Sequence, residues 1–316
     1  MKLGIIGCGY WGKIIINNLL SLGYEDLVLC DTKEVLDNIN IGRKFKRCTN
    51  YRRLKCDKVF VLTPSTQHYE ICKHFLGKGV DVFCEKVLTT AVETSKDLYR
   101  LAAINNAKLF VDWIFTFNQE VNKLKEVYDQ GKLGNIKHVT MNRQNFGPER
   151  YDVGAKIDLA SHDVSVLFYL FDQGLANKDW FCYKRNPASK QNDSTAGLLL
   201  FEGYTCLINA SWQYTKKDRM CYFDFENGFV TWDDTKKMLK IEYDFDLEAG
   251  DKESESKDAR YQRFFCIEVE PGSDLEAGDK ESESPLHTSL KNFLTNSRFD
   301  YKKQETLTLR IIGALE

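Results

Sequence analysis

The sequence predicts an α/β part followed by an α+β part that contains a large, mostly antiparallel open sheet. Two observations predict this order. Short apolar strands alternate with helices over residues 1–118, a pattern typical of a parallel sheet with right-handed crossovers. From residue 119 onward, most strands follow one another at hairpin spacing, which is typical of antiparallel pairing. We therefore expect two domains, residues 1–118 and residues 119–316.

The first strand, residues 2–6, runs directly into Gly7-Cys8-Gly9-Tyr10-Trp11-Gly12, and an apolar helix follows. A second strand, residues 27–30, then ends at Asp31. A strand, G-x-G-x-x-G, a helix and an acid about 20 residues further on form the dinucleotide-binding fingerprint of the Rossmann fold. An ordinary strand-to-helix turn would explain the glycines alone, but it would not explain the complete βαβ setting.

Each part of this fingerprint has a mechanical role. Gly7 permits the tight turn, Gly9 lets the backbone approach a pyrophosphate, and Gly12 lets helix and strand pack closely. Asp31 is placed to accept hydrogen bonds from ribose hydroxyls and to repel a 2′-phosphate, so we expect NAD as the cofactor in preference to NADP. The predicted cofactor-binding residues of the turn are Gly7, Gly9, Tyr10, Trp11 and Gly12.

The alternation continues with strands at residues 58–62, 81–84 and 108–111, separated by helices at 68–76 and 91–106. In such a sheet the ligand faces the carboxyl ends of the strands. The residues that follow these strands are therefore expected at the cofactor. They are Thr63, Pro64, His68, Glu85 and Lys86.

Composition narrows the class of protein. The net charge is −2, which provides no basic surface for nucleic acid and no polybasic membrane patch. Apolar runs are far shorter than the roughly 20 residues of a membrane span, and nothing before the first strand resembles a signal peptide. The ten cysteines include no C-x-x-C pair, so we expect reduced thiols, no metal site and a cytoplasmic location.

The second part begins with a helix at residues 121–128 and a strand at 136–144, and a helix at 157–171 follows. Six further strands are expected at residues 180–183, 196–201, 205–213, 219–226, 229–232 and 238–243. Asn227-Gly228 is a strong hairpin signal. The helices, including those expected at 286–295 and 307–315, are too few to cover both faces of the sheet, so we expect a homodimer or homotetramer.

An eleven-residue acidic segment occurs twice, at residues 246–256 and 274–284, with identical sequence. It is rich in serine and poor in apolar side chains, so it cannot build a core and is typical of a solvated loop. A charged interaction segment is the alternative interpretation.

Several motifs in order resemble the Gfo/Idh/MocA family of NAD(P)-dependent oxidoreductases, the glucose-fructose oxidoreductase and myo-inositol dehydrogenase relatives. The resemblance covers nearly the whole chain. The motifs are the Gly7–Gly12 turn with Asp31, Thr63-Pro64 with His68, Glu85-Lys86, Asp158 to His162-Asp163, and residues 285–294. It implies a Rossmann nucleotide-binding domain, an α+β substrate-binding domain, and hydride transfer between nicotinamide and a secondary alcohol or ketone of a sugar or nucleotide sugar.

Asp158 and His162 are four residues apart on an expected helix, so they share one face. Histidine titrates near neutral pH and can remove the proton of a sugar hydroxyl. Lys86, at the end of a parallel strand, can stabilise the developing charge on the reacting oxygen. We therefore predict Lys86, His162 and Asp158 as the catalytic residues. A helix-terminal acid, a hydrogen-bonded core histidine and a solvated lysine are the structural alternatives.

The segment before the Asp158 helix is expected to form a wall of the substrate pocket. Arginines there can hold a phosphate or carboxylate by bidentate hydrogen bonds, or can form a salt bridge. This stretch resembles nucleotide-sugar members of the family more than inositol members. The predicted substrate-binding residues are Arg143, Asn145, Arg150 and Asp158.

Two positions depart from the family pattern. Val87 stands where the family has proline after the lysine, and Gln119 stands where many relatives have proline. Neither change removes a chemical group, but both affect positioning. Val87 and the duplicated acidic segment favour the alternative to an enzyme, a non-catalytic NAD-binding sensor or scaffold protein of the same fold.

Overall fold

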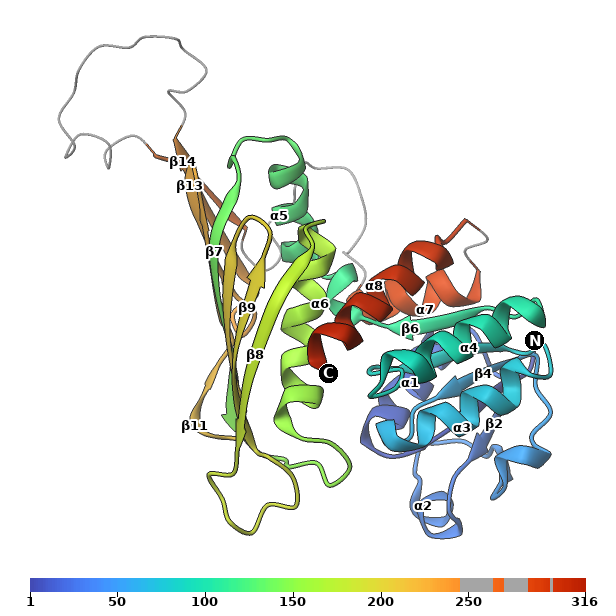
Figure 1. The fold of residues 1–316 in the computed structure, drawn as a ribbon. Helices are drawn as coiled ribbons and strands as arrows, with labels where there is room; N and C mark the ends of the chain where they lie inside the picture. Colours follow the sequence, from blue (N-terminus) through green and yellow to red (C-terminus); the bar gives the residue numbers. More distant parts are fainter. Residues whose placement is uncertain (245–263, 270–283, 296–297) are drawn as a thin grey trace, which may run out of the picture. The chain divides into compact units, whose positions relative to one another are not determined.

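The computed structural model describes residues 1–244, 264–269, 284–295 and 298–316 (Figure 1). The chain forms two compact units. The first contains Met1–Ile114 together with Glu283–Glu316, and the second contains Phe115–Ser282. Both acidic copies, residues 246–256 and 274–284, lie outside the described residues, apart from Ser284.

The first unit contains a six-stranded parallel sheet in the order β3-β2-β1-β4-β5-β6. This is the strand order of the Rossmann fold. The strands are β1 (Leu3–Ile6), β2 (Leu27–Cys30), β3 (Lys46–Cys48), β4 (Lys58–Val61), β5 (Asp81–Glu85) and β6 (Leu109–Asp112). The helices between them are α1 (Tyr10–Ser21), α2 (Lys33–Asn38), α3 (Ser65–Leu76) and α4 (Val92–Ile104). The predicted α/β class is confirmed for this unit.

The last two helices, α7 (Pro285–Leu294) and α8 (Tyr301–Leu315), return to the first unit. The Phe293 ring lies 5.4 Å from that of Phe60 and 5.6 Å from that of Phe83. At the edge strand β6, the side-chain amide of Gln304 accepts a hydrogen bond from the Val111 amide at 3.1 Å and donates one to the Val111 carbonyl at 3.0 Å. Residues 283–316, which the sequence analysis assigned to the second domain, therefore complete the core and the edge of the first unit.

The second unit contains a nine-stranded sheet in the order β15-β14-β13-β12-β7-β10-β9-β8, with β11 paired to β7. Only the β7–β10 pair is parallel among the described pairs of this sheet. The strands are β7 (Ile136–Phe146), β8 (Leu175–Tyr183), β9 (Ser194–Phe201), β10 (Thr205–Ser211), β11 (Gln213–Asp218), β12 (Met220–Phe225), β13 (Gly228–Asp233), β14 (Met238–Asp244) and β15 (Phe264–Val269). The predicted mostly antiparallel sheet is confirmed, although β15 was not expected.

Two helices of the second unit, α5 (Gln119–Asp129) and α6 (Ser161–Leu170), lie on one face of this sheet (Figure 1). Strands β12 and β13 form the expected hairpin, with Glu226 and Asn227 between them and Gly228 already in the strand. Across the described parts of the chain, no helix has both the length and the apolar character needed to cross a bilayer.

Candidate functional site

The glycine-rich turn between β1 and α1 has the geometry that a dinucleotide needs. Gly7 has φ +94°, and a Cβ there would lie 2.6 Å from the Leu62 carbonyl. A Cβ at Gly12 would overlap the Gly7 carbonyl oxygen. At Gly9, by contrast, a Cβ would meet no atom of the described residues within 4 Å. Gly7 and Gly12 are therefore required by packing, while the open side at Gly9 and the start of α1 fit a pyrophosphate.

Asp31 follows β2 and is tied to this turn. Its carboxylate accepts hydrogen bonds from the Cys8 amide at 2.6 Å and from the Thr32 amide at 2.7 Å. Its own amide donates to the Cys48 carbonyl at 3.2 Å. The carboxylate is thus fixed beside the glycine turn while part of Asp31 stays exposed, which suits contact with a ribose. Tyr10, at the start of α1, is 83% exposed.

His68 connects the loops that follow β4 and β5. Its ring is completely buried, with Nδ1 2.8 Å from the Val87 carbonyl oxygen and Nε2 2.8 Å from that of Thr63. A ring without exposed surface holds the two loops together. The contact of His68 with the cofactor stays a prediction, and in this structure both ring nitrogens lie beside backbone carbonyls.

Lys86 lies where β5 ends, at the carboxyl edge of the parallel sheet, and is 9% exposed. The Lys86–Val87 peptide bond is cis. The family's lysine–proline bond at this position is often cis, and the bond is cis here although valine replaces the proline. The neighbouring strand ends at Asp112, directly opposite Glu85 in register.

Asp112 is a buried carboxyl at the same edge of the sheet. Burial raises its pKa to about 6, although the Ser289 hydroxyl, which donates to it at 2.6 Å, acts in the opposite direction. Its charge therefore changes close to neutral pH. The sequence analysis gave Asp112 no role, because its burial depends on α7, whose Ser289 lies 177 residues away in the chain.

Asp158 lies in a short π-helical segment, η3 (Lys156–Ala160), that leads into α6. The Trp212 indole donates to its carboxylate at 3.2 Å, and the Arg150 guanidinium lies 3.7 Å away. Such π-helical turns are frequent at functional sites. The structure therefore brings together two predicted substrate residues, Asp158 and Arg150.

His162 lies in the first turn of α6, one turn beyond Asp158, and is half-buried. Its ring contacts that of Phe115 edge-on, with centroids 5.2 Å apart and planes at 79°. The Phe115 ring also lies 5.7 Å from that of Trp232. The Phe115 ring, itself packed against Trp232, limits the rotation of the imidazole.

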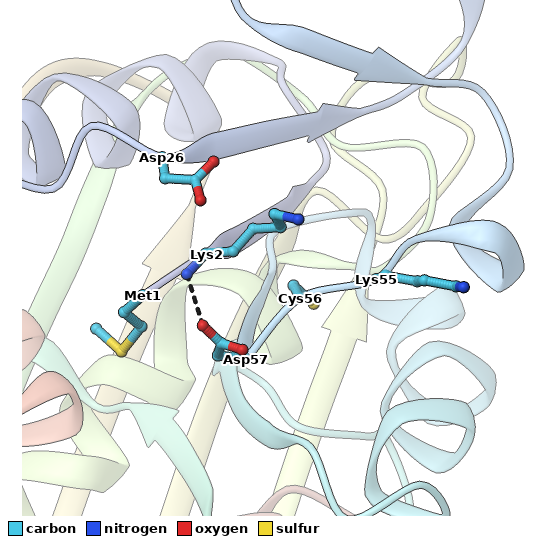
Figure 2. Close-up of a pocket in the computed structure, with 6 residues that line it drawn as sticks. All are labelled: Met1, Lys2, Asp26, Lys55, Cys56 and Asp57. Carbon is cyan, nitrogen blue, oxygen red and sulfur yellow. Dashed lines mark hydrogen bonds between the residues drawn. The ribbon is translucent and has the colours of Figure 1, made fainter.

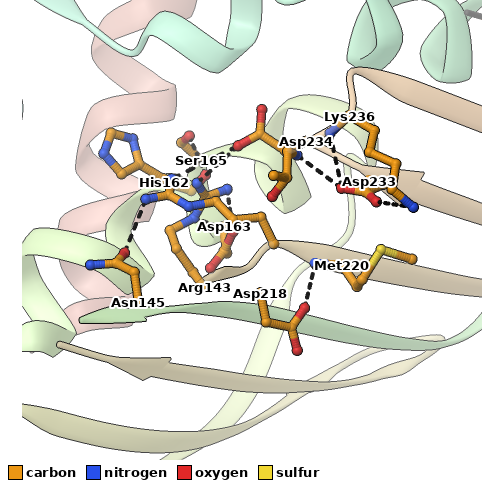
Figure 3. Close-up of polar contacts among 12 residues, drawn as sticks. Arg143, Asn145, His162, Asp163, Ser165, Asp218, Met220, Asp233, Asp234 and Lys236 are labelled. Atoms are coloured by element: carbon orange, nitrogen blue, oxygen red, sulfur yellow. Dashed lines mark hydrogen bonds and ion pairs between the residues drawn. The ribbon is translucent and has the colours of Figure 1, made fainter. Parts of the chain in front are cut away.

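Arg143 is completely buried, and its side chain lies beside Asp163 and Asp234 (Figure 3). Its guanidinium donates to Asp163 at 2.8 Å, lies 3.5 Å from Asp234, and is 4.6 Å from the centre of the Phe115 ring. Burial disfavours its charge, but the two carboxylates outweigh this effect and raise the pKa of Arg143. Arg143 thus forms the salt bridge that the sequence analysis gave as one of two interpretations, and its side chain has no exposed surface. Its contact with a substrate anion stays a prediction.

The two other predicted wall residues differ from each other. Asn145 accepts from Arg219 at 3.1 Å and donates to the Gly147 carbonyl at 2.7 Å, so it shapes the loop. Arg150 pairs with Asp152 at 3.1 Å, and its side chain is 39% exposed. Of the predicted arginines, Arg150 is thus the one with guanidinium surface near Asp158 that could meet a ligand.

A separate pocket lies at the amino ends of β1, β2 and β4 (Figure 2). There the Lys2 amide donates to Asp57 at 2.7 Å. The lining residues are Met1, Lys2, Asp26, Lys55, Cys56 and Asp57. Because the glycine turn follows the carboxyl end of β1, this pocket lies at the opposite edge of the sheet and is no part of the cofactor site.

Both parts of the chain match domain families of oxidoreductases. Residues 1–113 match a family described as "Oxidoreductase family, NAD-binding Rossmann fold". Residues 121–231 match the GFO/IDH/MocA C-terminal domain.

Individual proteins resemble the chain at lower identity. Inositol 2-dehydrogenase 1 of Mycolicibacterium vanbaalenii is 33% identical over 125 residues, which are 38% of this chain and 36% of that protein. The alignments span only about a third of the curated relatives. UDP-N-acetylglucosamine 3-dehydrogenase GnnA from Acidithiobacillus ferrooxidans has a TM-score of 0.76 at 17% identity, covering 100% of this chain and 95% of that one.

A third relative is the WlbA dehydrogenase from Bordetella pertussis, solved with NADH and UDP-GlcNAcA. It has a TM-score of 0.68 at 22% identity and covers 73% of each chain. At these identities the structural similarities establish the shared fold.

Proposed function

Because the chain belongs to the Gfo/Idh/MocA family of oxidoreductases and carries its NAD-binding Rossmann fold, we propose that it is an NAD-dependent dehydrogenase of a sugar or nucleotide sugar. The observation that carries this proposal is the placement of the polar residues. Lys86 lies at the carboxyl edge of the parallel sheet, and Asp158 and His162 lie one turn apart where η3 leads into α6.

In this proposal the glycine turn and Asp31 would hold NAD, which would supply the hydride acceptor for the reacting carbon. His162 removes the proton of the hydroxyl on that carbon, acting as the base. Lys86 donates a hydrogen bond to the same oxygen and stabilises its developing charge. Asp158, held by Trp212 and Arg150, accepts from a neighbouring hydroxyl of the sugar. The reverse reaction uses the same groups with the proton returned.

We propose a nucleotide sugar as the substrate class to test first. GnnA is a UDP-N-acetylglucosamine dehydrogenase, and WlbA was solved with UDP-GlcNAcA. In this chain Arg150 supplies a partly exposed guanidinium beside Asp158, which suits a phosphate or carboxylate group. Inositols are the second class, because several curated relatives are inositol dehydrogenases.

The test is NADH formation, followed by absorbance, with a panel of UDP-sugars, simple sugars and inositols. Turnover with one class supports the enzyme and identifies its substrate. NADH binding without turnover across the panel would instead support the non-catalytic sensor or scaffold that the sequence left open. A crystal soaked with NAD and the best substrate would then place the reacting carbon.

The chain should bind NAD more tightly than NADP. The Asp31 carboxylate is fixed at the turn by the Cys8 amide, where it accepts from ribose hydroxyls and repels a 2′-phosphate. The variant Asp31→Ser should raise the dissociation constant for NAD by about 10- to 100-fold, since a hydrogen bond to a charged group is lost. Fluorescence titration with both cofactors measures this preference. Asp26→Ser, at the other end of β2, is the matched control, and tighter binding of NADP by the unmodified protein would contradict the role of Asp31.

The second unit should mediate self-association, because no described helix of that unit lies on the outer face of its sheet (Figure 1). Leu207, Tyr222 and Phe229 are 42%, 36% and 38% exposed there. A homodimer or homotetramer would bury this face. Light scattering at micromolar concentration should show an oligomer, and Leu207→Glu should weaken it. Ile104→Glu, a charge placed at an exposed isoleucine of the first unit, should not. A monomer in the unmodified protein would rule out this assembly.

A further inference from the structure

Two thiols face each other at the edge of the parallel sheet. Cys30 ends β2 and Cys48 ends β3, and the two residues are paired in register. Their sulfur atoms are 3.8 Å apart. Neighbouring strands in a sheet lie about 4.8 Å apart, within the Cα spacing that a disulfide tolerates. The pair can therefore be closed by a local movement.

The backbone carbonyls of Cys30 and Cys48 accept hydrogen bonds from Gly7 and Asp31, which belong to the predicted cofactor site. The Gly7 amide donates to the Cys30 carbonyl at 3.1 Å, and the Asp31 amide donates to the Cys48 carbonyl at 3.2 Å. The Asp31 carboxylate in turn accepts from the Cys8 amide. A movement of either cysteine is therefore transmitted directly to the turn and to the ribose-binding carboxylate.

The two thiols differ in accessibility. Cys48 is partly exposed and lies on β3, the edge strand, which has only three residues. Cys30 is buried, and burial raises the pKa of its thiol. Cys48 is therefore the thiol that a reagent in solution reaches first, and Cys30 is the thiol that resolves the product.

We propose that Cys30 and Cys48 form a redox-active thiol pair, that a low-molecular-weight disulfide oxidises it, and that the resulting protein disulfide weakens NAD binding. The proposal depends on the NAD-binding fold alone and is independent of the proposed substrate.

The chemistry proceeds in two exchanges. The Cys48 thiolate attacks one sulfur of the small disulfide, forms a mixed disulfide and releases one small thiol. Cys30 then gives up its proton, attacks the Cys48 sulfur and releases the second small thiol. The two cysteines lose two electrons and two protons, and the small disulfide gains them as two thiols. A dithiol reductant reverses both steps.

Closing the pair shortens the sulfur separation from 3.8 Å to about 2.05 Å. Cys48 must also give up its contact with the Asn50 carbonyl, which its sulfur approaches at 2.9 Å. Strand β2 is completely buried, so the short edge strand β3 moves. That movement displaces the Cys48 carbonyl from the Asp31 amide and disturbs the carboxylate that binds the ribose.

The experiment uses the full chain, reduced and then incubated with oxidised glutathione. Mass spectrometry of unreduced peptides should find a Cys30–Cys48 link. The dissociation constant for NADH, measured by fluorescence, should rise about tenfold or more, as expected when a charged hydrogen bond is displaced. Dithiothreitol should restore the original value.

The chain provides its own controls. Measured against its own dissociation constant before oxidation, Cys48→Ser should show no response to oxidised glutathione, whereas Cys182→Ser, which removes an exposed thiol of the second unit, should keep the response. Cys72 and Cys84 also lie together but are both fully buried, so they should stay unlinked. A stable glutathione adduct on Cys48, a Cys30–Cys48 link with unchanged NADH binding, or a response that persists in Cys48→Ser would each overturn the proposal.

Discussion

His162→Ala should reduce turnover by about 10²- to 10⁴-fold while NAD binding stays nearly unchanged. The variant removes the proposed base, whereas the glycine turn and Asp31, which hold the cofactor, lie in the other unit. Lys86→Ala should have a comparable effect on turnover, because it removes the group that stabilises charge on the reacting oxygen. Steady-state kinetics and NADH titration measure the two properties separately. His138→Ala, on β7 of the same unit, is the matched control.

The pH profile of His162→Ala provides a second readout. A base must be unprotonated to accept a proton, so the proposed activity of the unmodified protein should fall as pH falls through the range in which histidine becomes charged. This acidic limb should be absent from the His162→Ala profile. If the variant retains full turnover on the true substrate, the base lies elsewhere, and Lys86 or Asp158 is the next candidate.

Arg143→Met should destabilise the fold by about 3–5 kcal/mol, because it leaves the buried carboxylate of Asp163 without its partner. Urea denaturation measures the loss. Arg150→Met breaks the partly exposed pair with Asp152 and should cost at most about 1 kcal/mol. Replacing both partners, in Arg143→Met with Asp163→Leu, should recover most of the stability, since the uncompensated charge is then gone. Equal losses for Arg143→Met and Arg150→Met would contradict a structural role for the buried pair.

The loss in Arg143→Met should also depend on pH. Burial already raises the pKa of Asp163, and Arg143 opposes that rise. Without the arginine the folded-state pKa of Asp163 rises further, so the folded state favours the neutral acid. The destabilisation should therefore be small near the pKa of the unfolded chain, about 4, and should grow as pH rises through the folded-state value.

The first unit was largely predictable because its elements follow local rules. The glycine turn, Asp31 and the alternation of strands and helices each depend on neighbouring residues, and the parallel sheet follows from them. The return of α7 and α8 to this unit was not predictable in the same way. An apolar helix face indicates that a helix is buried, but the partners of Phe293 and Gln304 lie more than 180 residues away in the chain.

In the second unit, the sequence carried a signal for the burial of Arg143 but none for its partners. Val139, Met141 and Arg143 are every second residue in the middle of β7, and all three are buried. The alternation of side chains along a strand therefore predicts that Arg143 faces the core. Its partner Asp163 lies within the buried apolar face of α6. The remaining carboxylate, Asp234, comes from 91 residues further along, and no local pattern connects it to β7. The placement of His162 beside Phe115 depends on the same long-range packing.

The hydrogen bonds between Gln304 and strand β6 determine which of the two units can finish folding first during synthesis. Residues 1–114 leave the ribosome first, but the edge of their sheet is closed by a side chain made only after the whole second unit, Phe115–Ser282, has been translated. The second unit is continuous in the chain and can fold as soon as it emerges. The nucleotide-binding unit, although it comes first in the sequence, is therefore the last to be completed.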